Sequence, residues 1–189
     1  MAGKGKTGGD HVCPWWFAYT FDNVFRRLIH DPVALLSPYL HEGMTVLDAG
    51  CGMGHFTIGM ARLVGDGGKV VAVDLQQEML DVMMKRAAAA KVERPILPRK
   101  CTPWTLGLKE RFGFALAFWM VHEVPASERL FREIFTHLEP SGLLLYAEPS
   151  FHVRERSFRE NGRRAEDAGF EPLPPPLIRF SRVSLYRKV

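Results

Sequence analysis

Two carboxylates flank a glycine-rich stretch near residue 50 of this 189-residue chain. Asp48 follows a short apolar run, and glycines then recur at every second position from Gly50 to Gly54. Such glycines permit a tight turn that lets a ligand approach the backbone closely. Asp74 ends the next β-branched run, at roughly the spacing beyond the loop where an acidic residue accepts hydrogen bonds from ribose hydroxyls. The pattern predicts a nucleotide site on a strand, a loop and a helix.

The spacing of the glycines separates two classes of nucleotide. A dinucleotide fingerprint reads Gly-x-Gly-x-x-Gly and seats a pyrophosphate on a helix N-terminus. This chain reads Gly-x-Gly-x-Gly, and the third glycine of the dinucleotide pattern falls at His55. A carboxylate at Asp48 is unfavourable beside a pyrophosphate and favourable beside an ammonium or sulfonium group. Both features count against a nicotinamide-dependent oxidoreductase, which stays as the second enzyme class.

The segment 46–54 resembles the first motif of the class I S-adenosylmethionine-dependent methyltransferases, and 71–74 resembles their acidic second-strand end. The resemblance covers about 44–189 and is closest to the small-molecule group that includes quinone-biosynthesis C-methyltransferases. It implies S-adenosyl-L-methionine as the cofactor and S-adenosyl-L-homocysteine as the product. The cofactor-binding positions that it implies are Asp48, Ala49, Gly50, Cys51, Gly52, Gly54, Asp74, Leu75, Met79, Cys101, Thr102, Ala117 and Phe118.

The chain departs from that family at two places. Cys101 and Thr102 stand where many relatives carry Gly-Asp-Ala, whose Asp accepts from the adenine amino group. A backbone group or the Thr102 hydroxyl is expected to substitute. Gly113 stands where relatives usually carry an acid. These departures keep open a cofactor-binding protein on a methyltransferase scaffold without turnover, because one fold hosts many functions.

Candidate acceptor-side residues follow the predicted fourth and fifth strands. The imidazole of His122 suits a general base near neutral pH, with capping of the next helix as the alternative. Glu123, Glu148 and His152 are further candidates for the substrate side, as is Tyr19 in the aromatic-rich N-terminal segment. The same residues could also serve packing alone. A compact, aromatic-rich chain favours a small apolar or aromatic acceptor.

Composition restricts the remaining partners. A net charge of +4 is too small an excess to establish a nucleic-acid partner, and residues 118–121 lack the Asn/Asp-Pro-Pro-Tyr tetrapeptide of base-amino methyltransferases. The sequence has no apolar run long enough for a membrane span. Three cysteines without Cys-x-x-Cys predict reduced thiols in the cytoplasm. His11 and Cys13 alone make a poor zinc site, so no metal is predicted. The oligomeric state stays open.

The expected order of strands and helices that position these residues predicts an α/β fold. We expect a Rossmann-like, seven-stranded, mostly parallel sheet with helices on both faces, a reversed last strand and an N-terminal helical cap. The expected division is a flexible tail at 1–10, the cap at 11–43 and a methyltransferase core at 44–189. The predicted strands are 44–47, 69–73, 94–98, 112–119, 143–147, 170–173 and 177–187, and the predicted helices begin near residues 32, 56, 76, 127 and 153. The last helix carries four i,i+4 charge pairs and is predicted to be solvated.

Overall fold

The strand, loop and helix predicted around residue 50 lie at the centre of the sheet. The computed structural model describes residues 29–189. Strand β1 (Thr45–Ala49) runs parallel to β2 (Lys69–Asp74) on one side and to β4 (Phe112–Phe118) on the other. These strands are nearly continuous apolar runs, as expected where both faces of a parallel sheet are covered.

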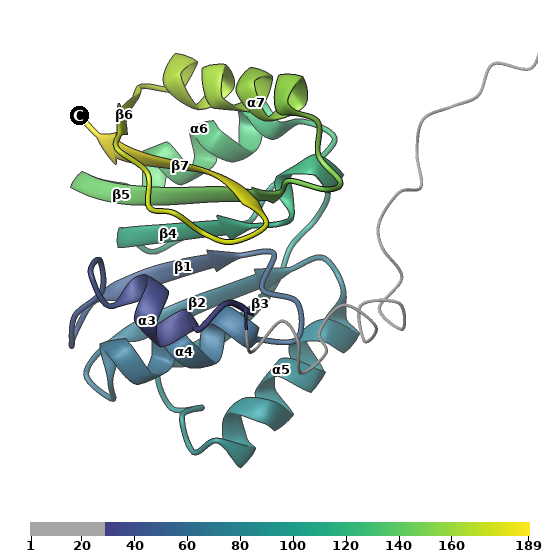
Figure 1. The fold of residues 1–189 in the computed structure, drawn as a ribbon. Helices are drawn as coiled ribbons and strands as arrows, with labels where there is room; N and C mark the ends of the chain where they lie inside the picture. The colour runs from purple at the N-terminus through teal and green to yellow at the C-terminus, as the bar shows by residue number, and fades with distance from the viewer. Residues whose placement is uncertain (1–28) are drawn as a thin grey trace, which may run out of the picture.

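The whole sheet has seven strands in the order β3-β2-β1-β4-β5-β7-β6. The other four strands are β3 (Ile96–Lys100), β5 (Leu138–Pro149), β6 (Phe170–Leu173) and β7 (Ser181–Lys188). Strand β7 is antiparallel to β5, so its arrowhead points opposite to those of β1 and β4 in Figure 1. The predicted Rossmann-like sheet with a reversed last strand is therefore confirmed.

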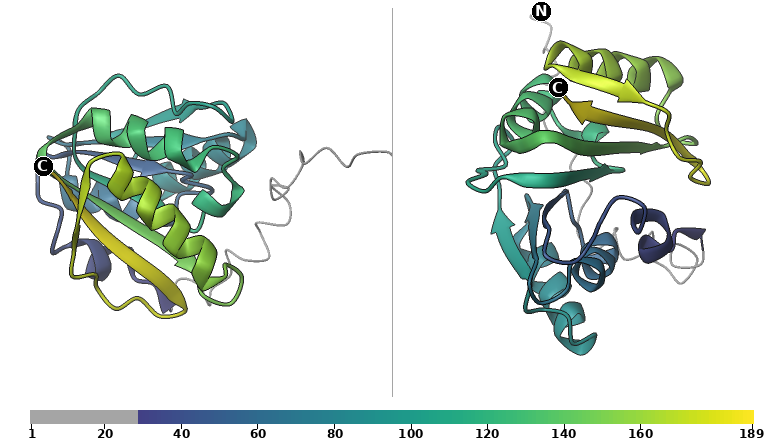
Figure 2. Two further views of the ribbon diagram at one scale, coloured as in Figure 1. Left: turned by 90° about the horizontal axis from the view of Figure 1, so that it is seen from above. Right: turned by 90° about the vertical axis from the view of Figure 1, so that its left-hand side faces the viewer.

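Helices cover both faces of the sheet, and each layer encloses its own core. The helices α3 (Pro32–Leu36), α4 (His55–Val64) and α5 (Gln77–Ala89) supply Leu36, Met60 and Leu80 to one core. On the opposite face, α6 (Ser127–His137) packs Phe131 against Tyr146 of β5, and α7 (Glu155–Asp167) adds Ala165. Figure 2 shows α3 and α4 on one side of the sheet and α6 on the other.

The connection between β3 and β4 is a loop, residues 101–111, on the same face as α6. Leu106 and Leu108 of this loop are buried in the second core. Glu133 of α6 holds the loop, because its carboxylate accepts from the backbone N–H of Leu106 at 3.0 Å and from the Thr105 hydroxyl at 3.0 Å. The loop thereby fixes the position of the residues that follow β3.

Two predicted strands have different boundaries in the structure. The third strand was expected at 94–98 and lies at Ile96–Lys100, because Ile96 N–H bonds back to the Glu93 carbonyl in a turn and Ile96 then pairs with Val70. The fifth strand was expected to follow a helix stop at 139–142. Strand β5 includes that segment as an irregularity, and the register with β4 shifts there from Leu138 to Leu143.

The last strand and the first described helix are shorter than predicted. Strand β7 starts at Ser181, because a turn from the Ile178 carbonyl to the Ser181 N–H precedes it and Phe180 has a φ of 57°. The helix expected to run past Leu36 ends there, and Pro38 follows two residues later. Pro38 has no backbone N–H for the next helical hydrogen bond to the Ala34 carbonyl, and the Ser37 hydroxyl donates to that carbonyl instead. The predicted Asp31 cap is confirmed, since its carboxylate accepts from Val33 N–H at 2.9 Å.

The helix predicted to be solvated, α7, has one buried face that contains Asn161, Gly162 and Ala165. Two of its four predicted charge pairs form, Glu155 with Arg159 and Arg156 with Glu160. Arg164 does not pair with Glu160 and instead donates to Ser127 and Asn161. The fourth predicted pair, Arg163 with Asp167, is not formed among the described residues. The prediction missed the buried face because alternating charges dominate the helix.

Several predictions fall outside the described residues. They are the tail at 1–10, the part of the cap at 11–28, Tyr19, and the pair His11 and Cys13. Within 29–189, none of the helices combines the length and apolar character needed to cross a membrane.

Candidate cofactor and acceptor site

The glycine loop closes over the carboxyl ends of the central strands. Gly50 and Cys51 both donate backbone N–H groups to the Val73 carbonyl of β2, at 2.8 and 3.0 Å. Gly50, Gly52 and Gly54 have φ values of 69°, 52° and 86°, which L side chains rarely adopt. Only glycine takes this path without strain, so the sequence spacing determines the loop.

Two of the three glycines are packed against side chains, and the third faces open space. A Cβ on Gly50 would lie 2.7 Å from the Met120 side chain, and one on Gly54 would collide with Met83. A Cβ on Gly52 would meet no heavy atom within 4 Å. The backbone at Gly52 is therefore the part of the loop that a ligand can approach.

Asp74 stands at the end of β2 beside this open backbone. Its Oδ2 accepts from Gly52 N–H at 2.9 Å and its Oδ1 from Gln76 N–H at 2.9 Å. Burial raises the pKa of the Asp74 carboxyl above its usual value, and the backbone N–H groups oppose that rise. A carboxylate oxygen has lone pairs beyond one such bond, so both oxygens can also accept from a ligand's hydroxyls.

Asp48 occupies a different environment. Its side chain is 3% exposed, and its Oδ2 accepts from the hydroxyl of Thr57 in α4 at 2.6 Å. Asp48 thus ties the end of β1 to the first turns of the helix that follows the loop. Its contact with the cofactor stays a prediction.

The other predicted cofactor positions surround the same edge of the sheet. Ala49, Ala117, Phe118, Cys51 and Met79 are buried, and the Phe118 ring packs 4.3 Å from the Phe56 ring. Leu75 and Cys101 are half-buried, and Thr102 is exposed. Cys101 N–H donates to the Asp74 carbonyl at 2.9 Å, which joins the ends of β2 and β3.

The polar residues after β4 and β5 meet in a hydrogen-bonded pair. Glu148, fully buried at the end of β5, accepts from His122 Nδ1 at 2.7 Å and from His122 N–H at 2.9 Å. Burial lowers the pKa of His122, but the hydrogen bond and the charge of Glu148 outweigh it, so the pKa is raised above 6.5. Glu123 Oε1 lies 3.8 Å from Nε2, and the rings of His122 and His152 are 5.1 Å apart. Four predicted acceptor-side residues, His122, Glu123, Glu148 and His152, are therefore brought together.

Trp119 is a candidate that the sequence interpretation did not single out. It follows β4 with a φ of 59°, an uncommon conformation for a bulky residue. Its indole Nε1 donates to Ser181 Oγ at 3.0 Å, and its ring lies 5.7 Å from that of the exposed Phe151. The ring of His30 stands edge-on to Trp119 at 5.3 Å. A positive φ leaves no signal in the sequence, which is why the residue was overlooked.

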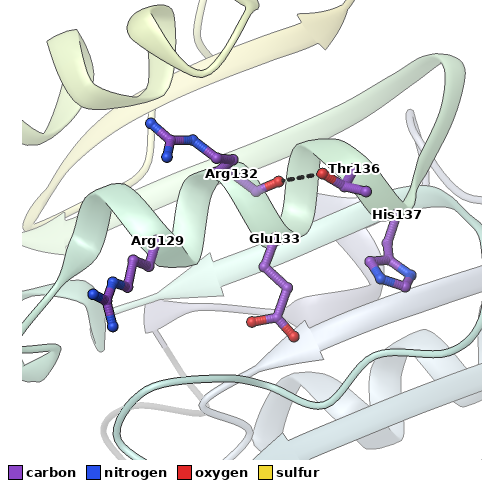
Figure 3. A pocket seen from close by; sticks show the side chains of 5 residues that line it. All are labelled: Arg129, Arg132, Glu133, Thr136 and His137. Carbon is purple, nitrogen blue, oxygen red and sulfur yellow. Dashed lines mark hydrogen bonds between the residues drawn. The ribbon is translucent and has the colours of Figure 1, made fainter.

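Of two pockets in the described part of the chain, only the second is lined by residues of this group. One, of about 290 Å³, follows the exposed side of α6 and is lined only by residues of that helix. Figure 3 shows Arg129, Glu133 and His137 on one side of the helix and Arg132 on another. The second, of about 520 Å³, lies between the segments after β4 and β5 and is lined by His122 and His152 among others. Within 29–189, no cluster of three or more metal-binding side chains is found.

The open Gly52 backbone, the two accepting oxygens of Asp74 and the apolar Leu75 beside them fit an adenosyl group. In comparisons with known proteins, residues 21–176 match the model of a family described as "Methyltransferase domain". The chain belongs to this family, and its fold and loop place it among the class I S-adenosylmethionine-dependent methyltransferases. Its cofactor is S-adenosyl-L-methionine.

Individual relatives are similar over parts of the chain. A demethylmenaquinone methyltransferase of Lactobacillus johnsonii is 29% identical over 101 residues, 53% of this chain and 41% of its own length. A ribosomal protein L11 methyltransferase of Dictyoglomus turgidum is 41% identical over 61 residues, 32% of this chain and 20% of its own. The chain thus spans less than half the length of these curated relatives.

Solved structures share the fold. A SAM-dependent methyltransferase from Aquifex aeolicus superposes with a TM-score of 0.83 at 23% identity, over 94% of this chain and 100% of that one. The [4+2]-cyclase SpnF superposes with a TM-score of 0.64 at 20% identity, over 76% and 58% of the two chains. A shared fold at this identity does not specify the reaction.

Proposed function

We propose that this protein transfers a methyl group from S-adenosyl-L-methionine to a small-molecule acceptor that has an apolar or aromatic part. The observation that carries the proposal is the pairing of Asp74 with the open backbone of Gly52 at the end of the parallel sheet. When bound, the cofactor supplies an electrophilic methyl group on a sulfonium sulfur. Much of the catalysis is then positioning of the acceptor in line with that methyl group.

The geometry of the loop supports the cofactor side of the proposal. The Asp74 oxygens accept from the two ribose hydroxyls, and Gly50 to Gly54 present the backbone to the adenosyl and methionine parts. Leu75 and Met79 offer apolar contacts, and the segment at Cys101 and Thr102 approaches the adenine. The N–H groups of Cys101 and Thr102 already donate to the Asp74 and Thr105 carbonyls, so the Thr102 hydroxyl and the backbone carbonyls of this segment are the candidate adenine partners.

The remaining predicted cofactor positions lie at the ends of the central strands, where we place the methionine part of the cofactor. They are Ala49, Cys51, Ala117 and Phe118. Because their side chains are buried, they contact the cofactor through the backbone. Asp48 orients the loop through Thr57 and adds negative charge near the sulfonium group.

On the acceptor side, we assign Trp119 and Phe151 to contact the apolar part of the substrate. Nε2 of His122 takes a proton from an acceptor that must lose one, while the Nδ1–Glu148 bond holds the ring and stabilises the imidazolium that results. Glu123 and His152 border the same place, and Tyr19 is proposed to complete it. We place the protein in the cytoplasm, where the free thiols of Cys51 and Cys101 stay reduced.

A small acceptor is favoured over RNA or protein by the demethylmenaquinone methyltransferases among the relatives and by the aromatic contacts at Trp119. Relatives that act on ribosomal RNA and on a ribosomal protein match shorter parts of this chain. The proposal therefore expects a metabolite to be methylated rather than a macromolecule.

Calorimetric titration with S-adenosylhomocysteine tests the cofactor half of the proposal, and saturable one-to-one binding is expected. NADH fluorescence, unchanged on mixing, serves as the control for the oxidoreductase alternative. Incubation with methyl-labelled cofactor and an extract of the source cell tests the acceptor half. Label in a small-molecule fraction is expected, whereas label in RNA or protein contradicts the proposed acceptor class, and cofactor binding without any labelled product contradicts turnover.

A further inference from the structure

The pocket of about 520 Å³ lies between the segments after β4 and β5, the start of α6 and one side of α7. Its volume is in the range of small-molecule sites. The residues that line it do not include the glycine loop, Asp74 or Trp119. Its lining includes Arg154, Arg164, His122, His152 and Glu160. The wall is therefore rich in cations and donors.

The charge balance of this wall is positive. Glu160 is the carboxylate of the lining, and Arg156 neutralises it through an ion pair of 3.0 Å. Within residues 29–189, neither Arg154 nor Arg164 has a carboxylate at ion-pair distance. In the part of the chain described, both guanidinium groups are therefore left without a direct ion pair to a carboxylate.

Buried polar residues hold one of these guanidinium groups in place. Arg164 Nη1 donates to Ser127 Oγ at 2.7 Å and to Asn161 Oδ1 at 3.0 Å. Ser127 and Asn161 are 2% and 7% exposed, and Asn161 Nδ2 donates onward to the Tyr146 hydroxyl at 3.4 Å. Guanidinium has five N–H donors in a planar fork, so the Nε and Nη2 groups keep donors beyond those two bonds. Because these bonds already fix the position of the guanidinium group, it loses little conformational entropy when a ligand binds.

Two helix N-termini add to the same wall. Ser127 is the first residue of α6, and Arg154 precedes the first residue of α7, with Ser157 in its first turn. Neither helix has a side-chain hydrogen bond at its N-cap. The first N–H groups of a helix lack intrahelical partners and carry partial positive charge. They support the arginines as donors to an anion.

We propose that this pocket binds a small anion-bearing compound, through a phosphate or carboxylate group held by Arg154 and Arg164. His122 and His152 also line this pocket. The inference concerns binding alone, and its test is independent of methyl transfer.

Inorganic phosphate and citrate, titrated at constant ionic strength, are the probes. Binding is followed by calorimetry and by amide chemical shifts of the full chain. We expect saturable binding of at least one anion, with shifts at Ser127 and Ser157. Arg154→Ala should weaken it about tenfold, the value of one charge-assisted hydrogen bond. Arg163→Ala, which removes an exposed arginine of the same helix outside the pocket, is the matched control and should leave the affinity unchanged.

Binding of one anion and not the other supports the proposal and identifies the head group. The proposal is overturned by any of three results. These are the absence of saturable binding to both anions, an equal loss in Arg154→Ala and Arg163→Ala, and shifts confined to residues 50–54. A thermal melt of each variant verifies that Arg154→Ala still folds. If Arg154→Ala does not fold, Arg154→Lys and Arg164→Lys are measured in its place. Unchanged affinity in Arg154→Lys together with a loss of affinity in Arg164→Lys still supports the site.

Discussion

At the scale of single residues, two carboxylates are held by neighbours that prepare them for different tasks. The oxygens of Asp74 are fixed by the backbone N–H groups of Gly52 and Gln76 at the open edge of the loop. Glu148 is fully buried and fixed by the side chain and the backbone of His122. We therefore propose that Asp74 faces a ligand, whereas Glu148 acts through the imidazole of His122.

Asp74→Ala should weaken binding of S-adenosylhomocysteine by about tenfold to a hundredfold. It removes the acceptors for the ribose hydroxyls, and each hydrogen bond to a charged group contributes about 1.5–3 kcal/mol. Calorimetry gives the affinity, and circular dichroism verifies the fold. Asp81→Ala, an exposed aspartate of α5, is the matched control. Equal affinity of Asp74→Ala and the unmodified protein would show that the ribose lies elsewhere.

The pH dependence of the reaction should report the pair formed by His122 and Glu148. Because Glu148 raises the pKa of His122 above the usual histidine value, the imidazolium persists to higher pH, and kcat/KM should rise with pH through that raised pKa. Glu148→Gln removes the charge and should move the rise to lower pH. Glu123→Gln, the weaker neighbour, should move it less.

The titration of the His122 ring, followed by NMR, measures the same pKa without turnover. A profile that does not move in Glu148→Gln, in a protein that still folds, contradicts the role of His122 as the base. Agreement between the NMR pKa and the kinetic pKa separates that role from a purely structural one.

At the scale of elements, the loop from β1 to α4 combines two glycines that let side chains pack against the backbone with one that is proposed to face the ligand. Gly50 and Gly54 allow Met120 and Met83 to pack against the backbone, and Gly52 leaves space open. The loop is also tied to β2 through the Val73 carbonyl. Its two functions can therefore be separated by substitution.

Gly54→Ala should lower the free energy of unfolding by several kcal/mol, because the new methyl group adds a collision with Met83 to the strain of a positive φ. Gly52→Ala should lower it by only about 1–2 kcal/mol, the strain of the positive φ alone. The same Gly52→Ala should weaken cofactor binding, since its methyl group occupies the approach to the backbone. Denaturant titration and calorimetry measure the two effects, and equal destabilisation by both substitutions would contradict the distinction.

At the scale of the whole molecule, the reversed strand β7 connects the sheet to the helix layer. It lies between β5 and β6, and Lys188 at its end donates to the Phe135 and Leu138 carbonyls at 2.7 and 2.8 Å. Those carbonyls belong to the last turn of α6 and to its C-cap residue, where a helix is partially negative. The terminal strand thus closes the second core.

Lys188→Met keeps an apolar stem and removes these bonds, so the free energy of unfolding should fall by about 1–3 kcal/mol. Thermal or denaturant unfolding measures it. Lys85→Met, on the exposed side of α5, is the control and should change stability little. A loss no larger than that of Lys85→Met would show that the contact between β7 and α6 contributes nothing.

The sequence by itself determined the strand, loop and helix, the order of most elements and the family. Glycine spacing, a β-branched run ending in Asp74 and amphipathic helices are local patterns, and local backbone sterics and burial produce them directly. Strand boundaries were less well predicted, because Ile96 and Ser181 begin pairing where neighbouring strands and turns allow it.

Only the tertiary structure decided which polar residues meet. His122 and Glu148 are separated by 26 positions, and Arg164 contacts Ser127 across 37 positions of the chain. The buried face of α7 and the positive φ of Trp119 likewise depend on contacts between distant segments. Such contacts follow from how the sheet orders its strands and how the helices pack on it, and no periodicity in a single stretch of sequence encodes them.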